Sequence, residues 1–444
     1  NRFFYVFCYI TNYMALPANL VSKYPAQSKF TNNTKAVFLI GLLFFIFGFV
    51  TWLNGTLIPF LKLACQLKTD TEAFFVTFSF YIAYFLLAIP SSYILKKTGF
   101  KNGMALGLLI MAIGSLIFIP AASTRNFYLF LSGLFIQGTG LALLQTASNP
   151  YISIIGPIES AAKRISIMGI CNKTAGALSP LILGFIVLKG IGHLESSINN
   201  ASTSIEKENL LQQLSSRIIP PYIVMAIVLL FLAVFIKRSS LPELKEETAE
   251  NENVQFKTSV FQFPHFLLGV LCIFLYVGVE VMAGDAIGTY GRTIGLSLDK
   301  TRYFTTFTLI AMLVGYIIGI ITIPKIISQQ KGLKLSALLG IVLTILIFIS
   351  SGYTAIFFIA LLGLANALMW PAIFPLAISG LGKFTKIGSA YLIMGIAGGA
   401  LMPLLYSYLK QNNNIGNSLA FLICILPSYA YILYYSTRGY KKGK

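Results

Sequence analysis

Residues 36–61, AVFLIGLLFFIFGFVTWLNGTLIPFL, contain no Asp, Glu, Lys or Arg. An α-helix needs about 20 predominantly apolar residues to cross the hydrocarbon core of a bilayer, so this stretch is long enough to span a membrane. Comparable stretches recur to the end of the chain, separated by shorter polar segments. The sequence therefore predicts an all-α membrane protein that crosses the bilayer many times.

The chain divides into two halves with six predicted spans each, twelve in all. The spans of the first half are residues 36–61, 73–95, 102–124, 126–158, 165–188 and 218–236. Those of the second half are 258–291, 303–324, two within 335–382, 387–409 and 411–437. The Glu-rich composition between the halves is that of a solvated linker. We predict an N-terminal segment (1–35), a six-helix half (36–236), a linker (237–257), a second six-helix half (258–437) and a tail (438–444).

Composition agrees with a chain that faces lipid. Hydrophobic residues make up 56% of the 444 residues and charged residues 11%, whereas about a quarter of a soluble domain is charged. The net charge of +19 resides largely in alternate segments between the spans. The positive-inside rule then places both termini and the linker in the cytoplasm, for a multi-pass protein of the inner membrane. The predicted partner of this charge is a lipid bilayer, and not a nucleic acid.

Signals for catalysis or for a metal cofactor are missing from the sequence. The five cysteines and two histidines form no CxxC pair and show no metal-ligand spacing. No HExxH motif, phosphate-binding loop or set of nucleophile, base and orienting residue is present. We therefore predict that the protein is not an enzyme and holds no cofactor.

The beginning of the chain does not resemble a signal peptide, because residues 1–13 hold one basic residue and no small-residue cleavage site. The first methionine is Met14. We expect Met14 to be the native start.

An internal repeat relates the two halves. The fourth span contains GLALLQTASNPYISIIG at 140–156, and the tenth contains the similar GLANALMWPAIFPLAISG at 363–380. Duplicated six-helix halves are typical of membrane transporters that bind substrate between the halves near the bilayer midplane.

Two acidic residues, Glu280 and Asp285, interrupt the seventh span. A carboxylate at the bilayer centre costs roughly 2.5–3.5 kcal/mol on insertion scales, so it usually faces a cavity or a partner. Five residues apart, the two point about 140° away from each other on a helix, so a shared ion site requires local unwinding. We predict Glu280 as the ion-coupling group, with Asp285, nearer the outer end, as the second candidate. The alternative is that Glu280 is a static partner of Lys173.

Lys173 lies well inside the fifth span beside Asn172. The functional interpretation makes Asn172 a substrate ligand and Lys173 the charge partner of Glu280. In the alternative, the lysine extends along its flexible stem to the cytoplasmic surface.

Further polar side chains occur at mid-depth in the spans. Gln145 and Asn149, four residues apart, share one face of the fourth span, where their amides can bind a polyol. Asn366 and Trp370 repeat this spacing in the tenth span, and an indole can stack on a pyranose. Asn54 adds a polar group in the first span. We predict all five as substrate contacts, and the alternative for them is hydrogen bonding and packing between helices.

Several motifs resemble the fucose/galactose/glucose:proton symporter family of the major facilitator superfamily, with its bacterial glucose/galactose transporters and fucose permeases. They are FVTWLNGTLIP at 49–59, LQTASNPY at 144–151, KRISIMG at 163–169 and YVGVE at 276–280. The resemblance extends from about residue 35 to the last span. It implies the two-half fold of that superfamily and a monosaccharide symporter that works by alternating access.

One departure from the family concerns the coupling ion. In a proton-coupled member, an Asp of the first span and a Glu of the fourth take part in proton coupling, and these positions are Gly55 and Gln145 here. An amide cannot carry a proton through the cycle, so Glu280, followed by Asp285, is the remaining titratable candidate. A sodium ion is an alternative to the proton, because a carboxylate with nearby carbonyl oxygens suits a hard cation.

The resemblance thus leads us to expect a secondary active transporter that imports glucose, galactose or fucose by cation-coupled symport, as a monomer. A sugar uniporter, an amino-sugar transporter of the same fold and a sugar sensor without transport activity are the alternatives.

Overall fold

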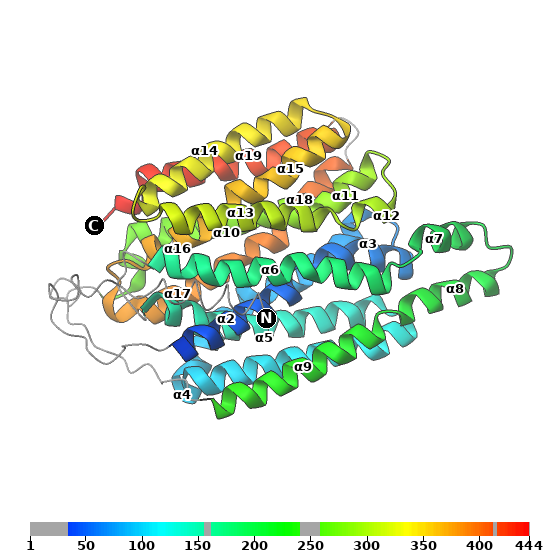
Figure 1. Ribbon diagram of the computed structural model, residues 1–444, viewed down its shortest axis with the longest axis horizontal. Coiled ribbons are helices and arrows are strands. Elements are labelled where there is room, and N and C mark those ends of the chain that lie inside the picture. The colour runs from blue at the N-terminus through cyan, green and yellow to red at the C-terminus, as the bar shows by residue number, and fades with distance from the viewer. Residues whose placement is uncertain (1–33, 155–160, 240–257, 412–414, 444) are drawn as a thin grey trace.

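The computed structural model describes residues 34–154, 161–239, 258–411 and 415–443. Every regular element within these ranges is a helix, and most of the helices lie side by side in one bundle (Figure 1). The predicted start at Met14 and most of the predicted linker fall outside the described residues.

The first half is built from six main helices. They are α2 (Thr34–Thr51), α3 (Asn54–Ala64), α4 (Asp70–Thr124), α5 (Phe127–Ile154), α6 (Ala161–Val187) and α9 (Ile219–Arg238). The long α4 contains two predicted spans, and the chain turns between them at Gly99, whose φ of 77° is in the left-handed region that favours glycine. A break at Trp52 and Leu53 separates α2 from α3 within the first span.

The second half repeats this plan with more interruptions. Its helices are α10 (Pro264–Gly284), α11 (Ala286–Thr293), α12 (Leu298–Thr301), α13 (Phe304–Thr322), α14 (Gln329–Ile349), α15 (Gly352–Asn366), α16 (Met369–Ile378), α17 (Thr385–Met394), α18 (Gly398–Lys410) and α19 (Gly416–Thr437). The seventh span breaks at Asp285, between α10 and α11.

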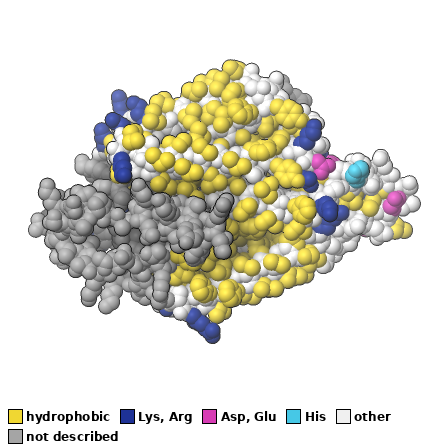
Figure 2. Space-filling model, in the orientation of Figure 1, with side chains coloured by type: hydrophobic (Ala, Val, Ile, Leu, Met, Phe, Trp, Pro, Cys, Tyr) yellow, Lys and Arg dark blue, Asp and Glu magenta, His cyan; other side chains and the backbone are white. Residues whose placement is uncertain are grey.

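The twelve predicted spans are confirmed. In the part of the chain that the structure describes, eleven helical stretches are long and apolar enough to cross a membrane. One of them, Asp70–Thr124, contains both the second and the third span, which gives twelve. Hydrophobic side chains cover the flank of the bundle, while Lys and Arg gather toward its two ends (Figure 2). On α9, Ile227 and Phe231 are 60% and 68% exposed, as expected for side chains that face lipid.

Two short helices project from one end of the bundle, which we call the α7–α8 end (Figure 1). They are α7 (Ile191–Asn199), which is amphipathic, and α8 (Ser204–Ser216), which is predominantly polar. Leu194 of α7 and Leu211 of α8 are buried, while Ile205 is 76% exposed. This hairpin could not be predicted from the sequence, because helices outside the membrane lack the long apolar run that marks a span.

The two halves meet along α6 and α13 and along α4, α17 and α18. Trp52, in the break of the first span, is wedged between them. A Cβ atom on Gly176 would lie 2.4 Å from Cδ1 of Trp52, and one on Gly284 would lie 2.1 Å from its Cζ3. The indole therefore fits only because glycine occupies both facing positions.

Candidate functional site

A cavity of about 90 Å³ lies at the interface of the two halves. Side chains of α2, α4, α5 and α6 line it from the first half, and side chains of α10, α13, α16 and the short helix η6 (Gly395–Ala397) line it from the second. Both halves contribute polar and aromatic groups. A ligand in this space would therefore contact both halves at once, which is the arrangement that alternating access requires.

One ion pair crosses the cavity wall from half to half. Nζ of Lys173 on α6 donates to Oε1 of Glu280 on α10 at 2.8 Å, and the two side chains are 8% and 11% exposed. The Lys173 ammonium also lies 4.4 Å from the centroid of the Trp52 ring. The predicted pairing of Lys173 with Glu280 is thus present, and the alternative in which Lys173 extends to the cytoplasmic surface is wrong. The role of this pair in ion coupling stays a prediction, with a static pair as the alternative.

Three of the predicted amides line the cavity. Gln145 donates from Nε2 to the Tyr84 hydroxyl at 3.0 Å, and Asn149 donates from Nδ2 to the Gln145 carbonyl at 3.0 Å. Asn172 donates from Nδ2 to the Phe44 carbonyl at 3.3 Å. The helical spacing of four residues places Gln145 and Asn149 on the same wall, as predicted.

Aromatic rings form much of the remaining wall. Trp370 lines the cavity, stacks on Phe374 at 5.6 Å between centroids and lies 6.4 Å from Tyr276. Four tyrosines that were not predicted as site residues also line the cavity: Tyr81, Tyr84, Tyr276 and Tyr316. A phenol at mid-depth in a span was the available signal, because a buried hydroxyl needs a polar partner.

Two predicted substrate contacts do not line the cavity. Asn366 is fully buried and accepts a hydrogen bond from the Tyr429 hydroxyl at 2.7 Å, away from the cavity wall. The break between α15 and α16 falls between Asn366 and Trp370, so the helical spacing from which Asn366 was predicted does not apply. Asn54 is also fully buried and outside the wall. In this conformation, neither prediction is supported as a contact in the cavity.

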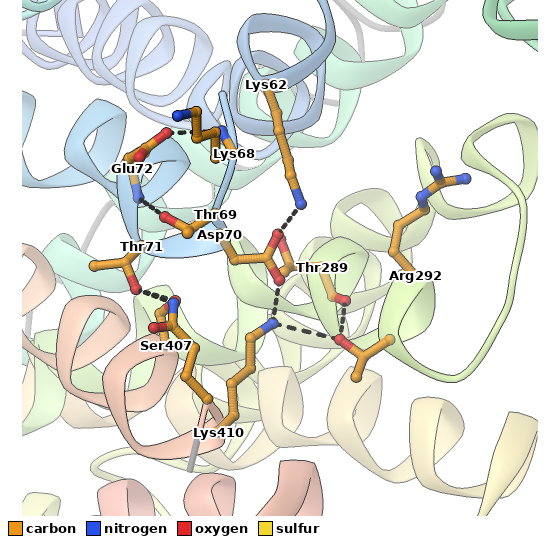
Figure 3. Close-up of polar contacts among 12 residues, drawn as sticks. Lys62, Lys68, Thr69, Asp70, Thr71, Glu72, Thr289, Arg292, Ser407 and Lys410 are labelled. Carbon is orange, nitrogen blue, oxygen red and sulfur yellow. Dashed lines mark hydrogen bonds and ion pairs between the residues drawn. The ribbon is translucent and has the colours of Figure 1, made fainter. Parts of the chain in front are cut away.

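Polar contacts tie the two halves together at the α7–α8 end (Figure 3). The Asp70 carboxylate at the start of α4 accepts hydrogen bonds from both Lys62 of α3 and Lys410 of α18. The Thr71 and Ser407 hydroxyl oxygens lie 2.9 Å apart beside it. Because Lys410 and Ser407 belong to the other half, these contacts close the bundle at this end.

Twelve membrane spans in two halves, with a polar cavity between the halves and closure at one end, define a multi-pass membrane transporter. The Major Facilitator Superfamily profile matches residues 40–404. The chain belongs to this superfamily, and it is therefore a transporter and not an enzyme.

Relatives with assigned transport functions cover nearly the whole chain. The glucose/galactose transporter of Brucella abortus biovar 1 (strain 9-941) is 33% identical over 403 residues, which is 90% of this chain and 93% of the relative. The L-fucose-proton symporter of Escherichia coli (strain K12) is 28% identical over 371 residues, 82% of this chain and 84% of the symporter. The crystal structure of FucP, a Major Facilitator Superfamily transporter, in the outward conformation superposes with a TM-score of 0.73 at 25% identity, over 90% of this chain and 97% of FucP.

Proposed function

We propose that the protein is a secondary active transporter that imports a monosaccharide, of the glucose, galactose or fucose type, by cation-coupled symport. The observation that carries the proposal is a cavity in which amides and a stacked indole lie beside an ion pair that joins the two halves. Amides of Gln145 and Asn172 can bind hydroxyl groups as donors and acceptors, and Trp370 offers an apolar face for a pyranose ring. The names of the relatives support the same class of substrate.

Uptake into proteoliposomes tests this proposal directly. We expect radiolabelled glucose, galactose or fucose to accumulate against its gradient when a sodium or proton gradient is imposed. Trp370→Ala should reduce sugar affinity by about tenfold or more, because a stacked aromatic contact of about 1–1.5 kcal/mol is lost along with its buried area. Trp370→Phe, which keeps an aromatic plane, is the matched control and should retain most of the affinity.

Three outcomes would decide against parts of the proposal. Equilibration without any gradient dependence would identify a uniporter. Sugar binding without uptake would identify a sensor. If none of the three sugars binds or enters, the proposed class of substrate is wrong, but the assignment of the fold is not affected.

We further propose that the protein is a monomer of the inner membrane with both termini in the cytoplasm. The α7–α8 end then faces outward, and this orientation can be tested at Cys65, the residue that follows α3 at that end. Burial raises the pKa of the Cys65 thiol to about 11, although nearby Arg125 acts in the opposite direction. The thiolate fraction at pH 7.5 is therefore smaller than that of an unburied thiol by roughly a hundredfold.

A membrane-impermeant thiol reagent added to spheroplasts should label Cys65 slowly at pH 7.5. The rate should rise about tenfold per pH unit, because the thiolate is the reacting species and remains a minor form below pH 11. Cys65→Ser is the control and should lose this labelling. Labelling of Cys65 in inside-out vesicles but not in spheroplasts would reverse the proposed orientation.

A further inference from the structure

The first and seventh spans occupy corresponding places in the two halves, and the helix is interrupted in each of them. The interruption falls near mid-length in the first span and nearer the outer end in the seventh. Trp52 and Leu53 separate α2 from α3, and Asp285 separates α10 from α11. Transporters often bind ions and substrates where helices of the two halves are interrupted. The two breaks lie against each other, since Trp52 packs on Gly284.

Asp285 is the most conspicuous polar group at these breaks. The residue is 1% exposed, and neither carboxylate oxygen has a hydrogen-bond partner among the described residues. The main-chain N–H of Gly55 is directed at the carboxylate. An ionised carboxylate buried in this way is strongly unfavourable unless a cation or donors neutralise it.

Glu280 differs from Asp285 in this respect. Its carboxylate is already paired with Lys173 at 2.8 Å, so a second cation gains little there. Lys173 and Glu280 act on Asp285 only through space, as does the Asp285 charge on Tyr81 of α4. The carboxylate that still needs a positive charge is therefore Asp285.

The Thr305 hydroxyl lies where Asp285 meets the first span. It donates to the Gly284 carbonyl at 2.8 Å, and its oxygen keeps lone pairs that can bind a cation. A Cβ atom on Gly55 would lie 3.3 Å from Oδ1 of Asp285 and 2.5 Å from Oγ1 of Thr305, so both oxygens face the same small volume. The residues on either side of Gly55 are Asn54 and Thr56, both fully buried. The Asn54 side-chain amide and the Thr56 hydroxyl have no hydrogen-bond partner in the part of the chain that the structure describes.

From this arrangement we infer that Asp285, Asn54, Thr56 and Thr305 form a sodium-binding site between the broken first and seventh spans. Carboxylate, amide and hydroxyl oxygens are the ligands that hard cations prefer. A proton would neutralise Asp285 alone, whereas a sodium ion would also satisfy the amide and hydroxyl oxygens around it. The role of this ion as the coupling cation rests on the proposed symport function, but the site itself does not. Asp285 thereby replaces Glu280 as the ion-binding carboxylate.

Trp52 separates this site from the sugar cavity. Its indole lines the cavity, packs on Gly284 next to Asp285 and lies under the Lys173 ammonium. A sodium ion that draws the first and seventh spans together would press on the same indole that borders the substrate. This contact supplies a direct physical link between the two ligands.

Tryptophan fluorescence of the purified full chain in nanodiscs tests the inference without sugar. The chain has two tryptophans, so Trp370→Phe leaves Trp52 as the single reporter. Sodium chloride should change the Trp52 emission in a saturable manner, while potassium and choline chloride at equal ionic strength should not. In this background Asp285→Asn should weaken sodium binding by at least about tenfold, and Glu280→Gln should retain it.

Thr56→Val provides a second test in case Asp285→Asn fails to fold. It removes an unpartnered hydroxyl at nearly constant volume, so we expect it to fold. It should weaken sodium binding, whereas Ser389→Ala, which removes a buried and unpartnered hydroxyl on α17, should leave it unchanged. The inference is overturned if potassium acts like sodium, if a change of pH alone reproduces the response, or if the response survives Asp285→Asn and Thr56→Val. A sodium response in a protein that fails to transport sugar would contradict the proposed function and leave this site standing.

Discussion

Lys173→Met is expected to abolish transport and to destabilise the protein by roughly 3–5 kcal/mol. The substitution leaves the Glu280 carboxylate buried at 9% exposure without its partner. Breaking one side of a buried ion pair is far more costly than removing both, because the remaining charge loses its compensation. Thermal unfolding of the detergent-solubilised protein at pH 8 measures the effect.

The double variant Lys173→Met with Glu280→Leu is the matched control. It removes both charges and should recover most of the stability, but it should not recover transport if the pair contributes to the cycle. Equal destabilisation by the single and double variants would show that the two side chains are not energetically coupled. Wild-type uptake by the double variant would make the pair purely structural.

Gly48→Ala is expected to destabilise the protein by roughly 3 kcal/mol and to eliminate sugar uptake. A Cβ atom at this position would lie 1.8 Å from the main-chain carbonyl oxygen of Asn172 and 2.5 Å from the carbonyl carbon. Main-chain atoms cannot swing aside as a side chain can, so α2 and α6 must move apart. That movement displaces Asn172 and Lys173 from the cavity wall.

Gly184→Ala provides the comparison for the same chemical change in a helix. The nearest atom to its added Cβ would be Cδ of Arg302 at 4.0 Å, so no clash arises. Alanine is favoured over glycine in a helix by about 0.5–1 kcal/mol, and this variant should be as stable as the wild type or slightly more so. Unfolding temperatures and uptake rates of the two variants, measured side by side, separate the steric effect from the change in helix propensity. Normal uptake by Gly48→Ala would contradict the close contact between α2 and α6.

The number of spans could be predicted from the sequence, because crossing a bilayer demands a long run of apolar residues that composition alone reveals. The breaks within spans could not. The helix is interrupted at residues 52–53 and 285, although Leu53 and Asp285 keep right-handed helical backbone angles. Such small interruptions arise where the two halves pack against each other, and this packing has no signature in one stretch of sequence. The short helices α7 and α8 could not be predicted either, because they lack the long apolar run that marks a span.

Whether a site residue could be predicted from the sequence depended on whether the helix around it is continuous. Gln145 and Asn149 sit on one continuous helix, α5, so a spacing of four residues reliably put them on one face. Asn366 and Trp370 have the same spacing but belong to different helices, and only Trp370 reaches the cavity. That Asp285 has no ion-pair partner among the described residues could not be predicted from the sequence, because it depends on how α10, α3 and α6 pack.

The shared carboxylate of Asp70 makes the closure at the α7–α8 end easy to reverse. Lys62 belongs to the same half as Asp70, whereas Lys410 belongs to the other. When the halves separate, Asp70 can remain neutralised by Lys62, and Lys410 passes into water, which solvates an ammonium group well. Separation of the halves at this point therefore leaves no buried charge without a partner or water.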